Sequence, residues 1–203
     1  MDPNSGPWRA VGKLQANASN LHSACTGTLI APATVLTAAH CLINPRTQAF
    51  FLPSSIHFLI GYARGEYAGH AKGVAFVIAP GFDSANPAET YGSDWALLTL
   101  DQKLGTPDRV LDLGAEPAVG TSVLIGGYGY DQPLLLMAGQ ACKIIGHTAD
   151  AKGRRLLQHN CAAVGGVSGA PLLAQVGMAW QVIGVDVAGY IGATGGVAAI
   201  VER

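Results

Sequence analysis

Short runs of apolar and β-branched residues follow one another along the whole chain, and glycine and proline separate them. Runs of this length, bounded by turn residues, are typical of β-strands. Only residues 150–158 suggest a helix. Because the runs recur without intervening helices, the pattern predicts an all-β protein built as a sandwich or as barrels. The predicted strands are residues 28–31, 34–37, 56–60, 74–78, 96–100, 122–125, 182–187 and 196–201.

A charged, proline-bearing stretch divides this pattern into two halves. It covers residues 101–117 and follows the strongly apolar run that ends at Leu100. A second series of strands begins near Thr121. We interpret the stretch as the crossing between two lobes.

Composition and charge exclude several classes of protein. Charged residues make up 12% of the 203 residues, against about 25% in typical domains, and hydrophobic residues 49%, so a disordered or coiled-coil chain is excluded. Twelve basic against thirteen acidic residues leave no excess for a phosphate backbone, and we expect no nucleic-acid partner. Pro, Gly and His interrupt the uncharged stretches, which argues against a membrane span. The first residues lack the pattern of a secretory signal, so an exported chain would have lost it.

The four cysteines favour a disulfide-bonded protein over a metal protein. None lies in a Cys-x-x-Cys pair, and no His, Cys or carboxylate cluster has ligand spacing, so we expect no metal and no cofactor. Of the three possible pairings, spacing favours Cys25 with Cys41 and Cys142 with Cys161. Four buried thiols are the alternative. Disulfides would require an oxidising compartment, which predicts a secreted or periplasmic protein.

Three short segments together carry the residues for acyl transfer. His40 follows an apolar strand, Asp94 opens another, and Ser168 lies in a glycine-rich turn. Each alone has an ordinary explanation as a turn or packing residue. In combination they supply a nucleophile, a base to take its proton and a carboxylate to orient that base. Glycine beside the serine would let the N–H groups of Gly166 and Ser168 point at one developing oxyanion.

These segments resemble the chymotrypsin-fold serine endopeptidases. The resemblance rests on CTGTLI from Cys25, VLTAAHC up to Cys41, DWALL from Asp94 and GVSGAP around Ser168, and it is closest to the bacterial branch that includes glutamyl endopeptidases. It implies two perpendicular six-stranded antiparallel β-barrels, about 8–103 and 121–203, joined by a crossing at about 104–120, with the active site in the cleft between them. It supports the same disulfide pairing and implies that His40 is the general base.

The resemblance breaks down at the residue before the serine. Animal trypsin-like enzymes carry an aspartate there, which pairs with the N-terminus released by zymogen cleavage, whereas this chain has Val167. Valine forms no ion pair, so we expect activity without that cleavage.

The specificity pocket departs from the family pattern as well. Ala162 falls where enzymes with a basic preference carry aspartate, and Asp186 matches the histidine that receives glutamate in glutamyl endopeptidases. A carboxylate would repel glutamate and favour Lys or Arg. Alternatively, Asp186 is hydrogen-bonded within the barrel and never meets substrate. Gly189 and Gly196 would leave the pocket mouth open.

The predicted function is therefore a monomeric serine endopeptidase that acts on proteins or peptides through an acyl-enzyme. A catalytically silent binding protein and an esterase on the same scaffold are the alternatives. An α/β-hydrolase is excluded, because its Gly-x-Ser-x-Gly elbow would require glycine where the chain has Ala170. The remaining histidines are interpreted as surface or packing residues: His22, His57, His70, His147 and His159.

Overall fold

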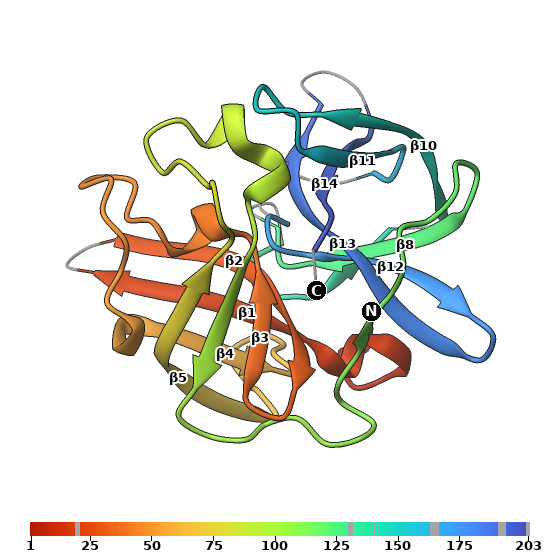
Figure 1. Ribbon diagram of the computed structural model, residues 1–203. Helices are drawn as coiled ribbons and strands as arrows, with labels where there is room; N and C mark the ends of the chain where they lie inside the picture. Colours follow the sequence, from red (N-terminus) through yellow and green to blue (C-terminus); the bar gives the residue numbers. More distant parts are fainter. Residues whose placement is uncertain (19–20, 130–131, 140, 163–166, 191–193, 202–203) are drawn as a thin grey trace.

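The N-terminal half forms a closed six-stranded barrel in the computed structural model, which describes residues 1–18, 21–129, 132–139, 141–162, 167–190 and 194–201. Its strands pair in the order β1-β2-β3-β6-β5-β4 (Figure 1). Alternate side chains point inward, and Leu14, Leu36, Phe58 and Leu98 are among the fully buried ones. The strands are β1 (Val11–Ala18), β2 (Leu21–Ala31), β3 (Thr34–Thr37), β4 (Ile56–Ile60), β5 (Gly69–Ile78) and β6 (Ala96–Leu100).

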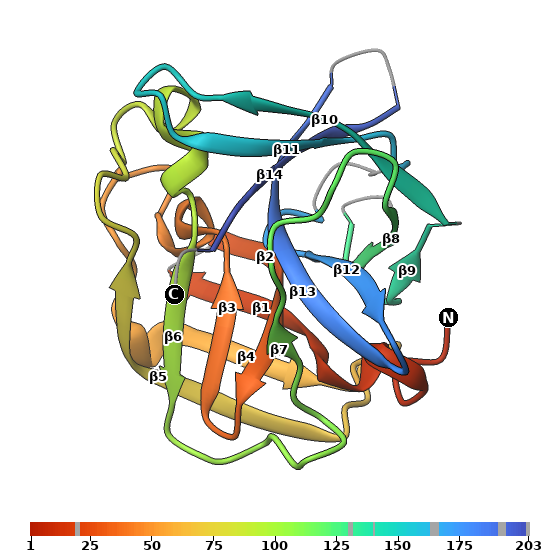
Figure 2. The same ribbon diagram turned by 45° about the vertical axis from the view of Figure 1, so that its right-hand side comes forward.

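The C-terminal half forms a second ring of strands (Figure 2). The order is β10-β11-β14-β13-β12-β8, and a further pairing of β10 with β8 closes it. The short strand β9 pairs with β8, and β7 pairs in parallel with β13. The strands are β7 (Asp112–Leu113), β8 (Ser122–Gly127), β9 (Met137–Ala138), β10 (Cys142–Ala149), β11 (Arg155–His159), β12 (Pro171–Val176), β13 (Ala179–Gly189) and β14 (Gly196–Ala199). The predicted all-β fold with two barrels is confirmed.

The predicted helix at residues 150–158 is wrong. Gly153 has a φ of 80°, which closes a tight turn, and β11 then begins at Arg155. β11 pairs with β10 on one side and with β14 on the other. The hairpin with β10 and the long-range ladder with β14 override the helical propensity of the local sequence.

Both predicted disulfides are present, Cys25 with Cys41 and Cys142 with Cys161. The first links β2 to the 3-10 turn η2 (Ala39–Leu42), and the second links the start of β10 to the segment after β11. Each therefore fixes a connection within one barrel. In the described part of the chain, no helix has the length and apolar character that crossing a membrane requires.

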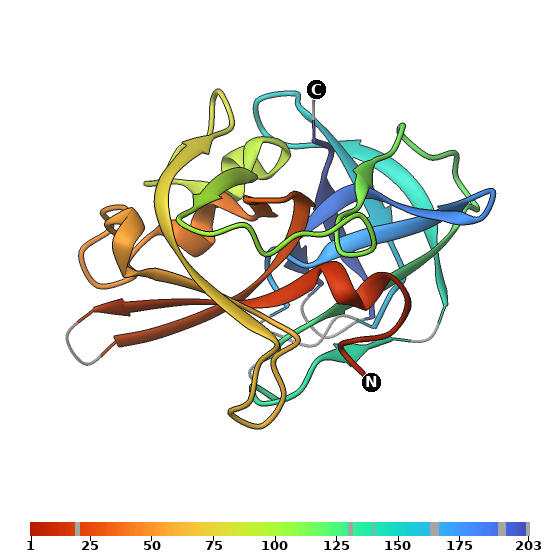
Figure 3. The same ribbon diagram turned by 90° about the horizontal axis from the view of Figure 1, so that it is seen from below.

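Hydrogen bonds from Thr26 join the two barrels, which lie side by side in the view from below (Figure 3). The backbone N–H of Thr26 donates to Ser168 O at 2.9 Å. Its hydroxyl oxygen accepts from the backbone N–H of Tyr128, also at 2.9 Å. Buried Lys13 adds a third link, because Nζ donates to Pro133 O at 2.7 Å. The bonds of Thr26 therefore join the two barrels next to the Ser168 turn.

Candidate active site

The register of β3 and β6 places His40 and Asp94 at the same end of the first barrel. These strands are antiparallel, with Thr37 opposite Ala96. His40 lies in η2 just after β3, and Asp94 lies just before β6, after the 3-10 segment η4 (Pro87–Ser93). Residues 54 positions apart in the chain therefore meet.

The Asp94 carboxylate holds His40 with both of its oxygens. Oδ2 lies 2.6 Å from His40 Nδ1, and Oδ1 accepts from the His40 backbone N–H at 2.8 Å. The Asp94 side chain is 0% exposed, whereas that of His40 is 27% exposed. Because a carboxylate only accepts, the ring proton is on Nδ1 and the lone pair is on Nε2. The pair presents one base atom in a fixed orientation.

Charge around the ring raises the pKa of His40 above its ordinary value. Burial opposes this by lowering the pKa. Burial is the largest single influence on this pKa, but the hydrogen bond to Asp94, the charge of Asp94 and the charge of Asp186 together outweigh it. The site thus stabilises the imidazolium that would form when His40 accepts a proton.

Ser168 is carried by a turn pressed against the first barrel. Its carbonyl oxygen accepts from Thr26 N and lies 3.7 Å from Cys41 Sγ, next to His40 in the chain. The following residue, Gly169, has a φ of 81°, and a Cβ there would lie 2.3 Å from Thr26 O. Only glycine permits this approach. The structure therefore brings Ser168 beside the His40 turn, while the predicted oxyanion residue Gly166 lies outside the described residues.

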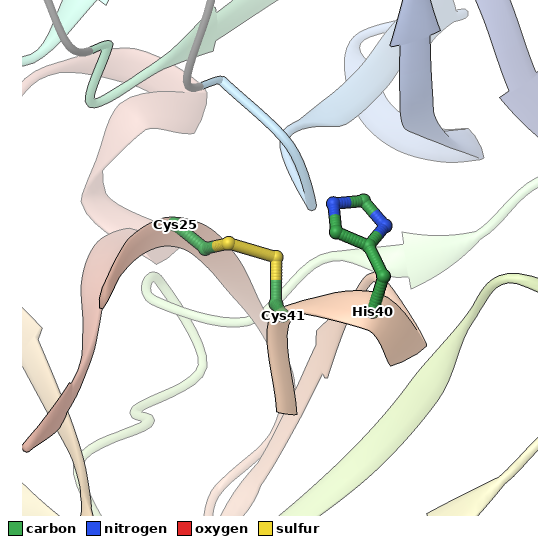
Figure 4. A group of neighbouring side chains, drawn as sticks. All are labelled: Cys25, His40 and Cys41. Atoms are coloured by element: carbon green, nitrogen blue, oxygen red, sulfur yellow. A yellow bond between two sulfur atoms is a disulfide. The ribbon is translucent and has the colours of Figure 1, made fainter. Parts of the chain in front are cut away.

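The Cys25–Cys41 disulfide fixes the turn that carries His40. Figure 4 shows the disulfide running from β2 to η2 and the imidazole extending from the same turn. Potential ligand atoms of Cys25, His40 and Cys41 lie within 4.8 Å of one another. Metal binding requires thiolates, and both sulfurs are used in the disulfide. The cluster is therefore structural.

Asp186 lies directly behind the Ser168 turn. Its backbone oxygen accepts from Gly169 N, and its N–H donates to Ala170 O, both at 2.9 Å. Its side chain is buried within the barrel, and Oδ1 lies 3.0 Å from Nε2 of His159, which is also fully buried. His159 was interpreted as a surface or packing residue. The apolar residues before it predict burial, but its partner depends on the register of β11, β14 and β13.

The other predicted pocket residues lie in two places. Gly189 pairs with Gly196 at the end of the β13–β14 ladder, on the strand that carries Asp186. Ala162 is exposed and lines a small cavity of about 100 Å³ together with Val167.

A larger cavity of about 440 Å³ lies between the end of β13, η4 and the β10–β11 hairpin. Tyr91, Leu156, Ala188 and Tyr190 contribute to its lining. Ala188 and Gly189 of β13 pair with β14 on one edge, while β12 pairs with β13 only as far as Val185. Within the described residues, no strand pairs with the opposite edge.

Asp150 ties the β10–β11 hairpin to the segment that carries Asp94. Its Oδ2 accepts from Gly92 N, and its Oδ1 accepts from the N–H groups of Lys152 and Arg154, each at 2.9 Å. An aspartate before a Lys-Gly turn predicts only the local bonds. The contact with Gly92, 58 residues away, was missed because it depends on how the barrels pack.

Comparison with curated proteins finds relatives that match part of this chain. Glutamyl endopeptidase of Bacillus licheniformis is 28% identical over 171 residues, which are 83% of this chain and 50% of that protein. A modular serine protease of Drosophila melanogaster is 31% identical over 102 residues, 47% of this chain and 16% of that protein. The chain thus spans half or less of the length of these curated relatives.

Solved structures share the fold. A Glu endopeptidase in complex with MPD has a TM-score of 0.75 at 22% identity, covering 98% of this chain and 88% of its own. Protease Anisep from Arthrobacter nicotinovorans has a TM-score of 0.74 at 20% identity, covering 95% and 90%. The family model described as Trypsin matches residues 1–203, and this chain therefore belongs to the trypsin family.

Proposed function

We propose that this chain is a serine endopeptidase in which Ser168 is the nucleophile, His40 the general base and Asp94 the orienting carboxylate. The observation that carries the proposal is the buried Asp94 carboxylate holding both the backbone and the ring of His40, beside the turn that bears Ser168. The names of the curated relatives, a glutamyl endopeptidase and a modular serine protease, support the same reaction class.

The proposed reaction proceeds through an acyl-enzyme. Ser168 Oγ bonds to the carbonyl carbon of the peptide while its proton moves to His40 Nε2. The tetrahedral adduct collapses by breaking the C–N bond, and the imidazolium returns the proton to the leaving amine. Water then repeats the sequence, with His40 as base, and releases the acid and Ser168. N–H groups in the Ser168 turn, including that of Ser168 itself, are suited to stabilise the oxyanion.

Substrate is proposed to lie along the open edge of β13, over residues 187–189, next to the cavity lined by Tyr91 and Tyr190. An extended peptide there adds a strand to the barrel, which is how backbone hydrogen bonds recognise peptides without regard to sequence. The two disulfides fit a secreted or periplasmic protein, because such bonds persist in oxidising compartments.

Labelling with a fluorophosphonate, located by mass spectrometry, tests the nucleophile directly. We expect one equivalent of label on Ser168 and none on the Ser168→Ala variant. A scan of peptide and simple ester substrates then separates an endopeptidase from an esterase. Absence of labelling in folded protein with intact disulfides would refute the proposal and favour a catalytically silent binding protein.

A further inference from the structure

Lys13 is a buried lysine whose charge no acidic residue neutralises. It is 4% exposed, and among the described residues no carboxylate forms an ion pair with it. Nζ instead donates to Pro133 O at 2.7 Å and lies 4.5 Å from the centroid of the Tyr62 ring. Burial lowers the pKa of this ammonium below its ordinary value, because the charged form has lost its water. An apolar side chain would fill the same space without that cost, so the gain from Lys13 lies in what its ammonium holds.

The contacts of Lys13 belong to a set that attaches the segment after β8 to the first barrel. Lys13 lies on β1 and Tyr62 follows β4, whereas Tyr128 follows β8. The Tyr128 hydroxyl donates to Tyr62 O at 2.9 Å. The two rings pack edge to face with their centroids 5.8 Å apart. The ammonium and the two rings therefore link the barrels at one place.

Thr26 connects this place to the turn that carries Ser168. It lies directly opposite Lys13 in the β1–β2 ladder, so the two side chains are on the same face of the sheet. Its Oγ1 accepts from the backbone N–H of Tyr128, and its own N–H donates to Ser168 O, each at 2.9 Å. Thr26 and Tyr128 are 0% and 1% exposed, so water does not compete for these bonds. We call Lys13, Tyr62, Tyr128 and Thr26 the inter-barrel cluster.

The segment that Lys13 holds also reaches the residue before Ser168. β9 follows Pro133 closely in the chain, and both of its residues line the cavity of about 100 Å³ together with Val167. A displacement of Pro133 would therefore move β9 relative to Val167. The cluster thus acts on both sides of Ser168, through Thr26 on its carbonyl and through β9 on the residue before it.

We propose that Lys13 is a positioning residue for catalysis, which acts through the inter-barrel cluster to hold the Ser168 turn in its active geometry. The proposal rests on the proposed endopeptidase function and deepens it. The turn carries both the nucleophilic Oγ and the Ser168 N–H that is suited to stabilise the oxyanion. A small shift of the turn would misalign both groups with the substrate carbonyl, while the substrate would still bind.

Lys13→Met is the first test, because methionine has a similar length and no charge. Pro133 is exposed, so its carbonyl oxygen can bond to water once the ammonium is gone. We therefore expect Tm to stay within about 4 °C of the wild-type value. On the best peptide substrate, kcat should fall about tenfold while KM changes by less than about twofold. The matched control is Lys72→Met, which replaces an exposed lysine on β5 and should leave kcat unchanged. Wild-type kcat in Lys13→Met would overturn the proposal.

An ester substrate and its thiono analogue distinguish positioning from a loss of folded protein. The sulfur anion that forms from the thiono ester accepts hydrogen bonds more weakly than an oxyanion, so its reaction depends less on the N–H groups of the Ser168 turn. Lys13→Met should therefore slow the oxygen ester at least about threefold more than the thiono ester. Equal slowing would contradict the proposal, because a smaller folded fraction lowers both rates by the same factor.

The other members of the cluster should act as one unit with Lys13. Thr26→Val removes the acceptor for Tyr128 N, whereas Thr26→Ser retains it and should keep most of the kcat that Thr26→Val loses. Tyr128→Phe removes the hydroxyl bond to Tyr62 O. Combining Tyr128→Phe with Lys13→Met should lower kcat by less than the product of the two separate factors, since both act on the same turn. A loss equal to that product would show that the two residues act independently and would refute the cluster.

Amide hydrogen exchange tests the coupling apart from catalysis. The N–H groups of Gly169 and Ala170 donate hydrogen bonds directly after Ser168. Their exchange in Ser168→Ala should become faster when Lys13→Met is added and stay unchanged when Lys72→Met is added. If a fluorophosphonate fails to label the wild type, the proposed reaction is refuted, while faster exchange would still support the link from Lys13 to the turn. Labelling of Ser168 together with unchanged exchange and unchanged kcat in Lys13→Met would refute the role of Lys13 alone.

Discussion

Replacing Asp94 by asparagine should abolish most activity while leaving the fold intact. The amide has the same shape, and its oxygen can still accept from the His40 backbone N–H. Its NH₂ group would then face Nδ1 of His40 and donate to it, where Oδ2 now accepts at 2.6 Å. This reverses the tautomer: the proton moves to Nε2, and the lone pair that should accept the serine proton is lost.

The expected loss in kcat is about 10⁴-fold, which corresponds to about 5 kcal/mol in the activation barrier. Exchange of charge-assisted for neutral hydrogen bonds should cost about 1–2 kcal/mol of stability, or roughly 2–8 °C in Tm for a chain of this size. Activity should therefore fall far more than stability. Steady-state hydrolysis of the best peptide substrate, with calorimetry on the same samples, measures both quantities, and Asp112→Asn serves as the control.

The pH dependence of this variant gives an independent check. The raised pKa of His40 contributes stability that is fully present below the unfolded pKa of about 6.5 and is lost as pH rises through the folded pKa. Removing the charge of Asp94 removes most of that contribution. The difference in unfolding free energy between wild type and Asp94→Asn should therefore be larger at pH 5 than at pH 9. Activity within tenfold of wild type, or a stability difference that grows with pH, would refute this reasoning.

Three further perturbations test how the site is supported. Gly169→Ala should destabilise the protein by at least about 1–2 kcal/mol and lower its activity, because residue 169 has a positive φ and an added Cβ would lie 2.3 Å from Thr26 O. Urea unfolding measures the loss of stability, and the rate of fluorophosphonate labelling measures the loss of activity. Replacing Cys142 and Cys161 together by serine should cost about 3 kcal/mol, or roughly 6–12 °C in Tm, without changing the labelled residue. Asp150→Ala should reduce kcat more than it raises KM, because it releases the hydrogen bond that holds the segment before Asp94. If Asp150→Ala lowers kcat by the same factor in a variant that already lacks Asp94, then Asp150 does not act through Asp94.

The sequence predicts best what is encoded within a few residues. His40, Asp94 and Ser168 were singled out because each lies in a short motif, and the disulfide pairing was predicted from spacing together with the family resemblance. The helix predicted at 150–158 does not form, because Gly153 makes a turn that lets β11 pair with β10. On its other edge β11 pairs with β14, which is remote in the chain. Side-chain partnerships across the barrel were missed for the same reason.

The His159–Asp186 pair illustrates this limit. No sequence motif links the two residues, which are 27 positions apart in the chain. Their meeting depends on β14 pairing with both β11 and β13, including an irregularity in the register after Asp186. The sequence left two interpretations of Asp186 open, and only the packed barrel supplies its histidine partner.

The hydrogen bonds at Thr26 suggest that the two barrels can reassemble after the chain between them is cut. The proposed base and carboxylate lie on the first barrel and the proposed nucleophile on the second, while the segment that connects the barrels is exposed at residues 101–103. A chain cut there would yield fragments that are each inert toward a fluorophosphonate. Mixing them should restore labelling with a concentration dependence set by the affinity of one barrel for the other. Enzymatic activity in this fold would then serve as a direct reporter of non-covalent reassembly.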